Sequence, residues 1–203
     1  AVVGFLSVCG GSVVGAIGLS RSAYVTSTDS APHQPVPFSH RHHVGELGID
    51  CRYCHASVET GPKAGLPPTA TCMTCHSQIW SNAAMLAPVR QSLTGNKPLR
   101  WTRVAKLPDY VFFRHDIHIA KGVGCVTCHG RIDTMPLTYR AHAFTMQFCL
   151  DCHRDPAPNL RPADKITDMT WKPAGNPRDL GAKIAEHVGI RSGELTHCYV
   201  CHR

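Results

Sequence analysis

The sequence predicts a mainly helical and irregular protein: one apolar helix that spans a membrane, followed by a domain of short helices and long loops. Three observations predict this fold. The first 20 of the 203 residues carry no charged side chain. The chain contains 17 Gly and 15 Pro but only 7% aromatic residues, so side chains alone are poorly suited to fill an interior. The pattern Cys-x-x-Cys-His occurs five times, which indicates that attached groups help to fill it.

The N-terminal segment, residues 1–25, is long enough to cross a bilayer as a helix. The alternative is a cleaved signal peptide, but the apolar run is longer than such peptides need and no small-x-small cleavage site closes it. We therefore expect an uncleaved anchor. Lipidation of Cys9 remains a minor alternative, because Val8 stands where a lipidation site prefers a small residue.

Small residues recur on one side of this expected helix. Small side chains let a second membrane helix approach closely, although glycine is also common in membrane helices in general. The spacing favours a partner helix against this side, formed by Gly4, Ser7, Gly11, Gly15 and Gly18. Residues 26–37 are rich in Ser and Pro and predict an extended linker.

The repeated motif is the attachment signature of c-type haem. Its two thiols bond to the haem vinyl groups, and the adjacent His binds the iron as the proximal ligand. The predicted attachment residues are Cys51, Cys54, Cys72, Cys75, Cys125, Cys128, Cys149, Cys152, Cys198 and Cys201. The predicted proximal ligands are His55, His76, His129, His153 and His202.

Two other interpretations of the cysteines explain less. The first two pairs, which begin at Cys51 and Cys72, have spacing that suits a four-cysteine zinc ribbon. An exported chain also permits disulfides. Neither explains why His follows every pair, so the motif favours five covalently bound haem c groups.

An internal duplication divides the haem domain, which we place at residues 38–203. Phe-x-His-x-x-His precedes a haem motif at both 38–55 and 113–129, and a second motif follows each. The chain thus predicts two-haem modules at 38–80 and 113–155, with a fifth haem at 198–202. Pro-rich connections and a short helix at 181–190 are expected between the last two motifs.

The distal iron ligands are interpreted partly by resemblance to small bis-histidine multihaem cytochromes, in which Phe-x-His-x-x-His supplies them. That resemblance implies His40 for the haem at Cys51 and His115 for the haem at Cys125. His142 lies seven residues before Cys149 and suits the fourth haem. His43 and His118 are then left for the haems at Cys72 and Cys198, with the assignment between them open.

Weaker distal candidates are Met146, which would raise the potential of the fourth haem, and His187 for the fifth. We interpret His33, His42 and His197 as surface or hydrogen-bonded residues. If protein ligands fill the sixth position on all five irons, no position is open for a small-molecule substrate, and the chain is not an enzyme on its own.

The formal charge of +7 would ordinarily favour an acidic partner. Five haems with ionised propionates change it to about +2 when ferric and about −3 when ferrous. Nucleic-acid binding is therefore not expected.

The stretch LRWTRVAKLPDYVFFRHDIHIAKGVGCVTCHG at 99–130, with five motifs and one anchor, resembles the pentahaem cytochrome subunit of Alternative Complex III. The resemblance covers nearly the whole chain, and LPDYVFFRH is its most specific part. It implies an electron-transfer subunit that works with integral quinol-oxidising subunits, an iron–sulfur subunit and a further cytochrome c. In that family the electrons pass to a soluble carrier or an oxidase.

The same resemblance implies a place in the bacterial cytoplasmic membrane. Because c-type haems are attached on its outer side, the haem domain is expected on the periplasmic face. Two alternatives remain open: a pentahaem donor to a periplasmic reductase, and a multihaem enzyme with one open iron.

Overall fold

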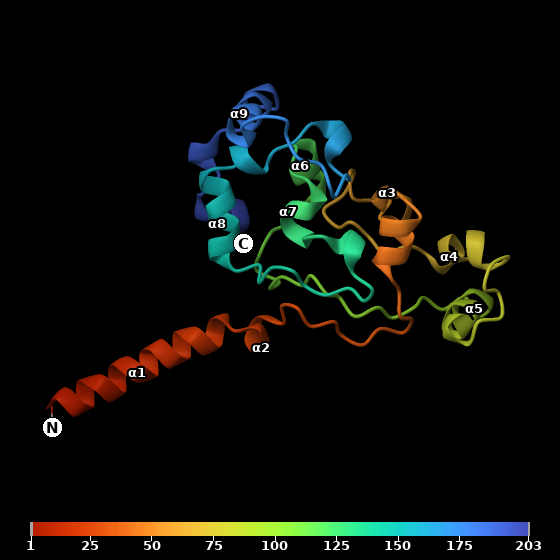
Figure 1. The fold of residues 1–203 in the computed structure, drawn as a ribbon, viewed down its shortest axis with the longest axis horizontal. Helices are drawn as coiled ribbons and strands as arrows, with labels where there is room; N and C mark the ends of the chain where they lie inside the picture. Colours follow the sequence, from red (N-terminus) through yellow and green to blue (C-terminus); the bar gives the residue numbers. More distant parts are fainter. Residues whose placement is uncertain (1, 203) are drawn as a thin grey trace.

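The computed structural model describes residues 2–202, so Ala1 and Arg203, the outermost residues of the predicted anchor and haem domain, lie outside the described residues. The described chain is helical and irregular, and within it the only extended pairings are isolated bridges. The predicted fold class, with a single apolar N-terminal helix, is confirmed (Figure 1).

The helices of the domain are short, and most are one or two turns long. Longer helices occur only at the N-terminal end and near the C-terminal end. In chain order the elements are α1 (Val2–Arg21), α2 (Ala23–Thr26), the π-helical turn η1 (Arg41–Glu46), α3 (Cys51–Cys54), α4 (Thr69–His76), η2 (Ala84–Leu86), α5 (Ala87–Thr94), α6 (His115–Ala120), α7 (Cys125–His129), η3 (Ile132–Thr134), α8 (Met146–Arg154), η4 (Ala157–Asn159), η5 (Ala163–Lys165), α9 (Pro177–His187), η6 (Ser192–Glu194) and α10 (Cys198–Cys201).

Helix α1 is long and apolar enough to cross a membrane, with a mean hydropathy of 2.0 and no buried residue. Ser7 and Ser12 donate hydrogen bonds to carbonyls four residues earlier, so their hydroxyls are satisfied within the helix. The glycines of the predicted small-residue side have no atom within 4 Å of a built Cβ. That side is therefore open, and a partner helix against it stays a prediction.

Arg140 ties the end of the anchor to the domain. Its guanidinium donates to the carbonyl oxygens of Thr26 at 2.9 Å, Val104 at 3.1 Å and Lys106 at 3.1 Å. Thr28 forms a parallel bridge with the backbone of Arg140 itself. One side chain thus joins three segments that are far apart in sequence.

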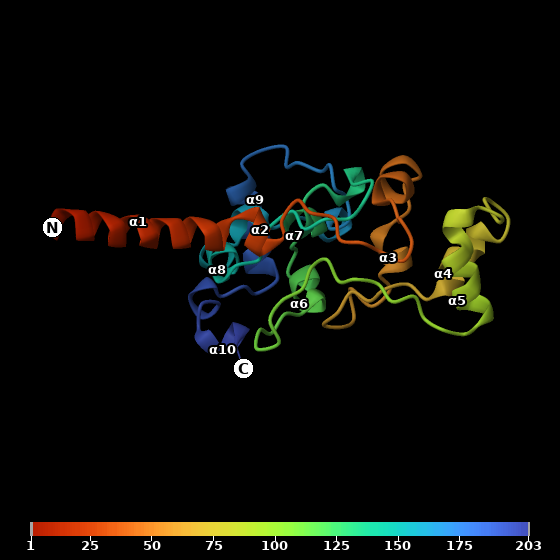
Figure 2. The ribbon, with the colours of Figure 1, turned by 90° about the horizontal axis from the view of Figure 1, so that it is seen from below.

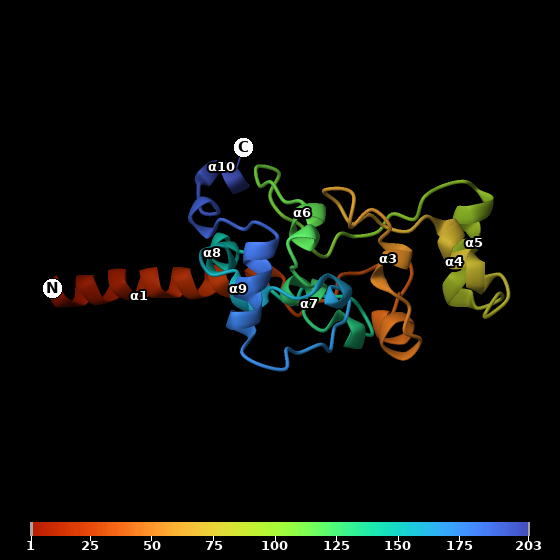
Figure 3. The same ribbon diagram turned by 90° about the horizontal axis from the view of Figure 1, so that it is seen from above.

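The molecule is elongated, with α1 at one end and the α4–α5 pair at the other. Three views agree on this order, in which α3, α7 and α8 lie between the two ends (Figures 1, 2 and 3). Because membrane helices tilt by only about 20° on average, an α1 that spans a bilayer would project α4 and α5 away from the membrane.

Buried apolar side chains are few and scattered. The described residues contain a cluster of Val36, Leu86 and Val89 near α5, with Leu99 and Trp101 packed against it. Other buried side chains, such as Met135 and Leu160, lie elsewhere. An interior this sparse agrees with the expectation that protein side chains do not fill it by themselves.

Helix α9 begins earlier than the predicted helix at 181–190. Asn176 caps it by accepting a hydrogen bond from the Arg178 amide, and Pro177 occupies its first position. The helix ends at His187. The cap and the proline are local signals for a helix start. They place the start of α9 at Pro177, four residues before Gly181, where the predicted helix began.

Candidate haem-binding sites

Each Cys-x-x-Cys-His motif adopts the same local structure. The two cysteines are one helical turn apart on α3, α4, α7, α8 and α10, so both thiols lie on one side of a short helix. The His that follows is at the helix end or just after it. This arrangement presents two sulfurs and one imidazole to a single neighbouring group.

The cysteines form neither disulfides nor a zinc cluster. All eleven thiols are free. Within residues 2–202, no three His, Cys, Asp or Glu side chains gather as metal ligands would. The four sulfurs of the possible zinc ribbon, Cys51, Cys54, Cys72 and Cys75, therefore do not form one site, and the helical pairs favour haem attachment.

The first and third motifs each face a histidine from the duplicated element. The rings of His40 and His55 have centres 6.5 Å apart and planes 9° apart. The rings of His115 and His129 repeat this relationship at 6.4 Å and 6°. The two copies thus share one geometry, and both pairs are those that the bis-histidine resemblance implies.

The second and fourth motifs face the second histidine of each element. His43 lies 6.1 Å from His76, with ring planes 65° apart. His118 lies 6.2 Å from His153, with planes 26° apart. The structure therefore brings His118 to the fourth motif, for which His142 was expected, and His43 to the second motif.

These separations fit an iron between the rings. An imidazole nitrogen binds a metal at about 2.0 Å and lies about 1.1 Å from its ring centre, so two axial ligands have centres about 6 Å apart. The Nδ1 atoms are held from the other side. His43 bonds the Ser39 carbonyl at 2.9 Å and His118 the Arg114 carbonyl at 2.6 Å.

Five of the other rings are also held by hydrogen bonds at Nδ1. Nδ1 of His55, His115 and His153 bonds a backbone carbonyl at 2.8, 3.0 and 2.9 Å respectively. His76 bonds the Ile79 carbonyl at 3.2 Å, and His40 bonds the Thr138 hydroxyl at 2.8 Å. A carbonyl can only accept, so it fixes the proton on Nδ1 and leaves Nε2 with its lone pair available for a metal.

Burial keeps several of these imidazoles neutral. Together with the smaller effect of neighbouring histidines, it lowers the pKa of His40 and of His129 to about 4 each. Burial also lowers the pKa of His43 and His118. A neutral imidazole is the form that binds a metal.

A phenylalanine orients both histidines of each duplicated element. Phe38 stacks on His43 at 4.4 Å and meets His40 edge-on at 4.9 Å. Phe113 stacks on His118 at 4.6 Å and meets His115 edge-on at 4.7 Å. The Phe of Phe-x-His-x-x-His therefore packs against both distal candidates at once.

The remaining distal candidates make no ring contact with a motif histidine among the described residues, although His142 is near enough to His129 to add to the lowering of its pKa by burial. His142 stacks on Phe148 with ring centres 5.1 Å apart. Met146 is 62% exposed at the start of α8, and His187 is exposed at the end of α9. None of the three shows the opposed-ring geometry of the other sites.

The residues interpreted as surface histidines have other partners. His42 bonds the Glu46 carboxylate at 2.8 Å and lies parallel to Trp80. His197 bonds the Tyr199 hydroxyl at 3.0 Å. His33 is exposed, and its carbonyl accepts a bond from Thr102.

The fifth motif has a different neighbour. Tyr110 lies with its ring 5.9 Å from that of His202. The adjacent backbone pairs with the motif, because Val111 bridges His202 and the Phe112 amide donates to the Cys201 carbonyl at 2.7 Å. Sequence reasoning did not identify Tyr110 as part of this site, although it lies within the quoted LPDYVFFRH.

The motifs lie in space in the order second, first, third, fourth and fifth. Burial raises the pKa of the Cys54 thiol, and the nearby Cys72 thiol adds to the rise. Next along this order, Cys51 and Cys125 are within hydrogen-bonding reach of each other. The first motif, not the second, therefore adjoins the second module.

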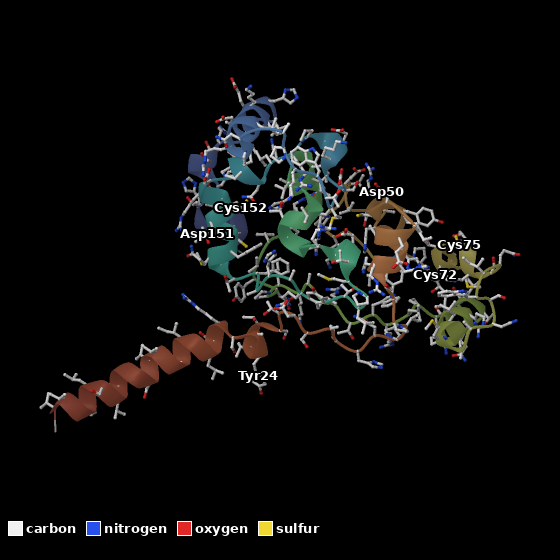
Figure 4. All side chains as sticks on the ribbon, viewed as in Figure 1. Tyr24, Asp50, Cys72, Cys75, Asp151 and Cys152 are labelled. Atoms are coloured by element: carbon white, nitrogen blue, oxygen red, sulfur yellow. The ribbon has the colours of Figure 1, made fainter. Side chains whose placement is uncertain are left out.

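Cysteine thiols of the third, fourth and fifth motifs also lie close to one another in turn. Burial raises the pKa of Cys128 to about 11, with Cys152 as a close neighbour. Burial and the proximity of Cys201 raise the pKa of Cys149. Figure 4 shows Cys72 and Cys75 on α4 near one end of the domain and Cys152 on α8 toward the other.

The comparison with known proteins agrees with this class of site. No protein-family model matches the chain. The chain is similar to the menaquinone reductase, multiheme cytochrome c subunit, of Nitratidesulfovibrio vulgaris. The two are 28% identical over 212 residues, which cover 96% of this chain and 91% of the relative.

Proposed function

We propose that this chain is a membrane-anchored electron-transfer subunit of a quinone oxidoreductase complex and carries five covalently attached haem c groups. The observation that carries the proposal is the set of opposed histidine rings, 6.1–6.5 Å apart, beside four attachment motifs. The similar multiheme subunit of menaquinone reductase supports the same class of function.

Each part of the chain then has a role. Residues 1–25 form the anchor, 26–37 the linker, and 38–203 the haem domain with modules at 38–80 and 113–155. The ten motif cysteines attach the haems, and the five motif histidines bind the irons from one side. On the other side, His40 serves the first motif, His43 the second, His115 the third and His118 the fourth.

Protein ligands on both sides leave those four irons closed to substrates. When bound, each haem supplies an iron that alternates between ferric and ferrous states and so carries one electron. The buried imidazoles and the carbonyls that orient them hold the iron positions fixed, which favours electron transfer over chemistry on a bound molecule.

The spatial order of the motifs supports a single path. The fifth and fourth motifs lie toward α1, and the second motif lies at the far end (Figure 1). Electrons exchanged with membrane partners would therefore pass through the fourth or fifth site, then the third and first, to the second. The partners expected are integral quinone-binding subunits, an iron–sulfur subunit and a further cytochrome c on the periplasmic side.

The resemblance to Alternative Complex III favours quinol oxidation, with electrons moving away from the membrane. The relative gives a specific second candidate, because its name describes a menaquinone reductase, in which electrons move toward the quinone. The same order of sites serves either direction. A donor to a periplasmic reductase would use the same order of sites in the direction of the first candidate, with electrons moving away from the membrane.

The test is purification of the full chain in mild detergent from a host that attaches c-type haem. We expect a mass increase of five haems that survives acid extraction, and membrane subunits that copurify. Release of the pigment by acid would contradict covalent attachment. Quinol-driven reduction of the haems by the intact complex would favour the first candidate, and quinone reduction from pre-reduced haems the second.

A further inference from the structure

The end of the molecule farthest from α1 is basic and contains no acidic residue. We define the basic tip as residues 67–101, which include α4, η2 and α5. Three cationic side chains and no carboxylate occur in this segment: Arg90, Lys97 and Arg100. Residues 102–203 differ, because ten carboxylates there accompany fourteen cationic side chains. The tip thus carries positive charge with no carboxylate in its own segment.

The cations of the basic tip are available to a partner. In the described structure none of the three forms an ion pair. Lys97 and Arg100 are exposed, and Arg90 is half-buried against the carbonyls of Ser81 and Ala83. A ferric haem at the second motif would add roughly −1, so the segment stays about +2.

Neighbouring carboxylates are already paired. Glu46 is near the basic tip because His42, four residues earlier, lies parallel to Trp80. Its carboxylate is 3.5 Å from the Arg41 guanidinium and 2.8 Å from the His42 ring. Glu59 is 3.3 Å from Arg52. These carboxylates have their own cationic partners and do not pair with the cations of the tip.

Exposed apolar side chains lie among these charges. Trp80 is 60% exposed, Ile79 55% and Met85 50%. They follow the second motif directly in the chain, and Cys75 of that motif is itself exposed. Exposed apolar side chains combined with cations and no carboxylate are the composition expected of a transient electron-transfer interface, which is small and forms quickly under electrostatic attraction.

We infer that the basic tip is the docking surface for a small acidic redox protein that exchanges electrons with the second haem site. The inference rests on the proposed function, because it needs a haem at Cys72 and Cys75. Its position supports a soluble partner, because Cys72 and Cys75 lie at the end opposite α1 (Figure 4). The cluster of Val36, Leu86 and Val89, against which Cys72 packs, holds the tip together. A membrane surface is the less favoured occupant, because α1 enters the bilayer at the other end.

The test uses the full haem-loaded chain in detergent and two redox probes: an acidic two-iron ferredoxin and a basic mitochondrial cytochrome c. We expect the second-order rate with the acidic probe to fall about tenfold or more as salt rises from about 10 to about 150 mM, because the Debye length shrinks from about 30 to about 8 Å. The rate with the basic probe should stay level or rise.

The decisive variant is Lys97→Gln/Arg100→Gln, with Lys172→Gln/Lys183→Gln as the control. Both remove two exposed positive charges, but the control charges lie outside the basic tip, on and before α9. We expect the tip variant to slow the acidic probe about three- to tenfold at low salt and the control to slow it less than twofold. Equal slowing by both variants would overturn the inference, because net charge alone would explain it.

Two further outcomes are distinguishable. If the tip variant weakens binding to vesicles of anionic phospholipid but leaves the acidic-probe rate unchanged, the surface serves a membrane and the inference is wrong. Haem content and the low-spin spectrum are measured on every variant. A wild-type chain without covalent haem contradicts the proposed function itself, whereas five haems and no dependence on the tip contradict only the docking surface.

Discussion

His118 lies opposite His153, with the ring centres 6.2 Å apart and the Nδ1 atom of each ring bonded to a backbone carbonyl. This relationship joins the helix α6 to the end of α8. Because His115 on the same helix faces His129, one short helix supplies distal candidates to two neighbouring motifs. A single short helix thereby links two candidate iron sites.

His118→Ala should leave five haems covalently attached but convert one iron to the high-spin state, because the fourth site loses its distal imidazole. The reduced variant should also bind carbon monoxide at that iron. Electron paramagnetic resonance of the oxidised protein and the carbon monoxide difference spectrum measure both changes.

His142→Ala is the matched comparison. Its ring stacks on Phe148 and makes no ring contact with a motif histidine, so the variant should stay as low-spin as the wild type. A high-spin signal from His142→Ala, with none from His118→Ala, would restore the pairing suggested by sequence spacing and contradict the geometric one.

Gly181→Ala should destabilise the domain, because a Cβ at this position overlaps the Ala157 carbonyl where α9 packs on η4. Overpacking against backbone typically costs about 1–3 kcal/mol. Gly175→Ala is the control, since nothing lies within 4 Å of its built Cβ. Thermal unfolding followed by the haem absorbance measures both, and similar midpoints for the two variants would show that the α9 contact is not tight.

Asp50→Ala should lower the stability by about 1 kcal/mol, the usual effect of losing an N-cap. The Asp50 carboxylate accepts from the Arg52 amide at the start of α3 and from the Thr167 hydroxyl of a distant loop. The hydrogen bonds from the Arg52 guanidinium are the largest cause that lowers the pKa of Asp50 to about 2. Because the folded pKa is depressed, the contribution is fully present above the usual carboxyl pKa of about 4 and is lost as the pH falls through about 2.

Thermal midpoints of wild type and Asp50→Ala between pH 6 and pH 2 test this dependence. The difference between them should be constant above about pH 4 and should shrink toward pH 2. A difference that grows as the pH falls would mean that Asp50 acts through something other than its ionised carboxylate.

The sequence predicts the local parts of the sites well, because local chemistry defines them. Cys-x-x-Cys-His spans barely more than one helical turn, and the apolar run of α1 is contiguous. The choice between His118 and His142 is different. Spacing favoured the histidine nearer to Cys149, but the tertiary contact between His118 of α6 and His153 of α8 decides which ring faces His153, and no local pattern encodes that contact.

Tyr110 was missed for a related reason. Its position beside His202 follows from a single backbone bridge between segments that are distant in the chain. The Nδ1 acceptors were also beyond sequence reasoning, since most are backbone carbonyls, which every residue possesses. The duplication was the best available signal, because Phe38 and Phe113 proved to hold equivalent positions relative to the histidines.

Phe113→Leu should loosen both distal histidines of the second module. The ring stacks on His118 and meets His115 edge-on, and such aromatic pairs contribute about 0.5–1.5 kcal/mol beyond their buried area. Losing that amount shifts the equilibrium between bound and detached imidazole about two- to tenfold. We expect more carbon monoxide binding to the reduced variant than to the wild type, at the third and fourth sites only.

Phe148→Leu is the control, because the Phe148 ring stacks on His142, which makes no ring contact with a motif histidine. Equal carbon monoxide binding by the two variants would mean that Phe113 acts only as general apolar filling and does not orient the ligands.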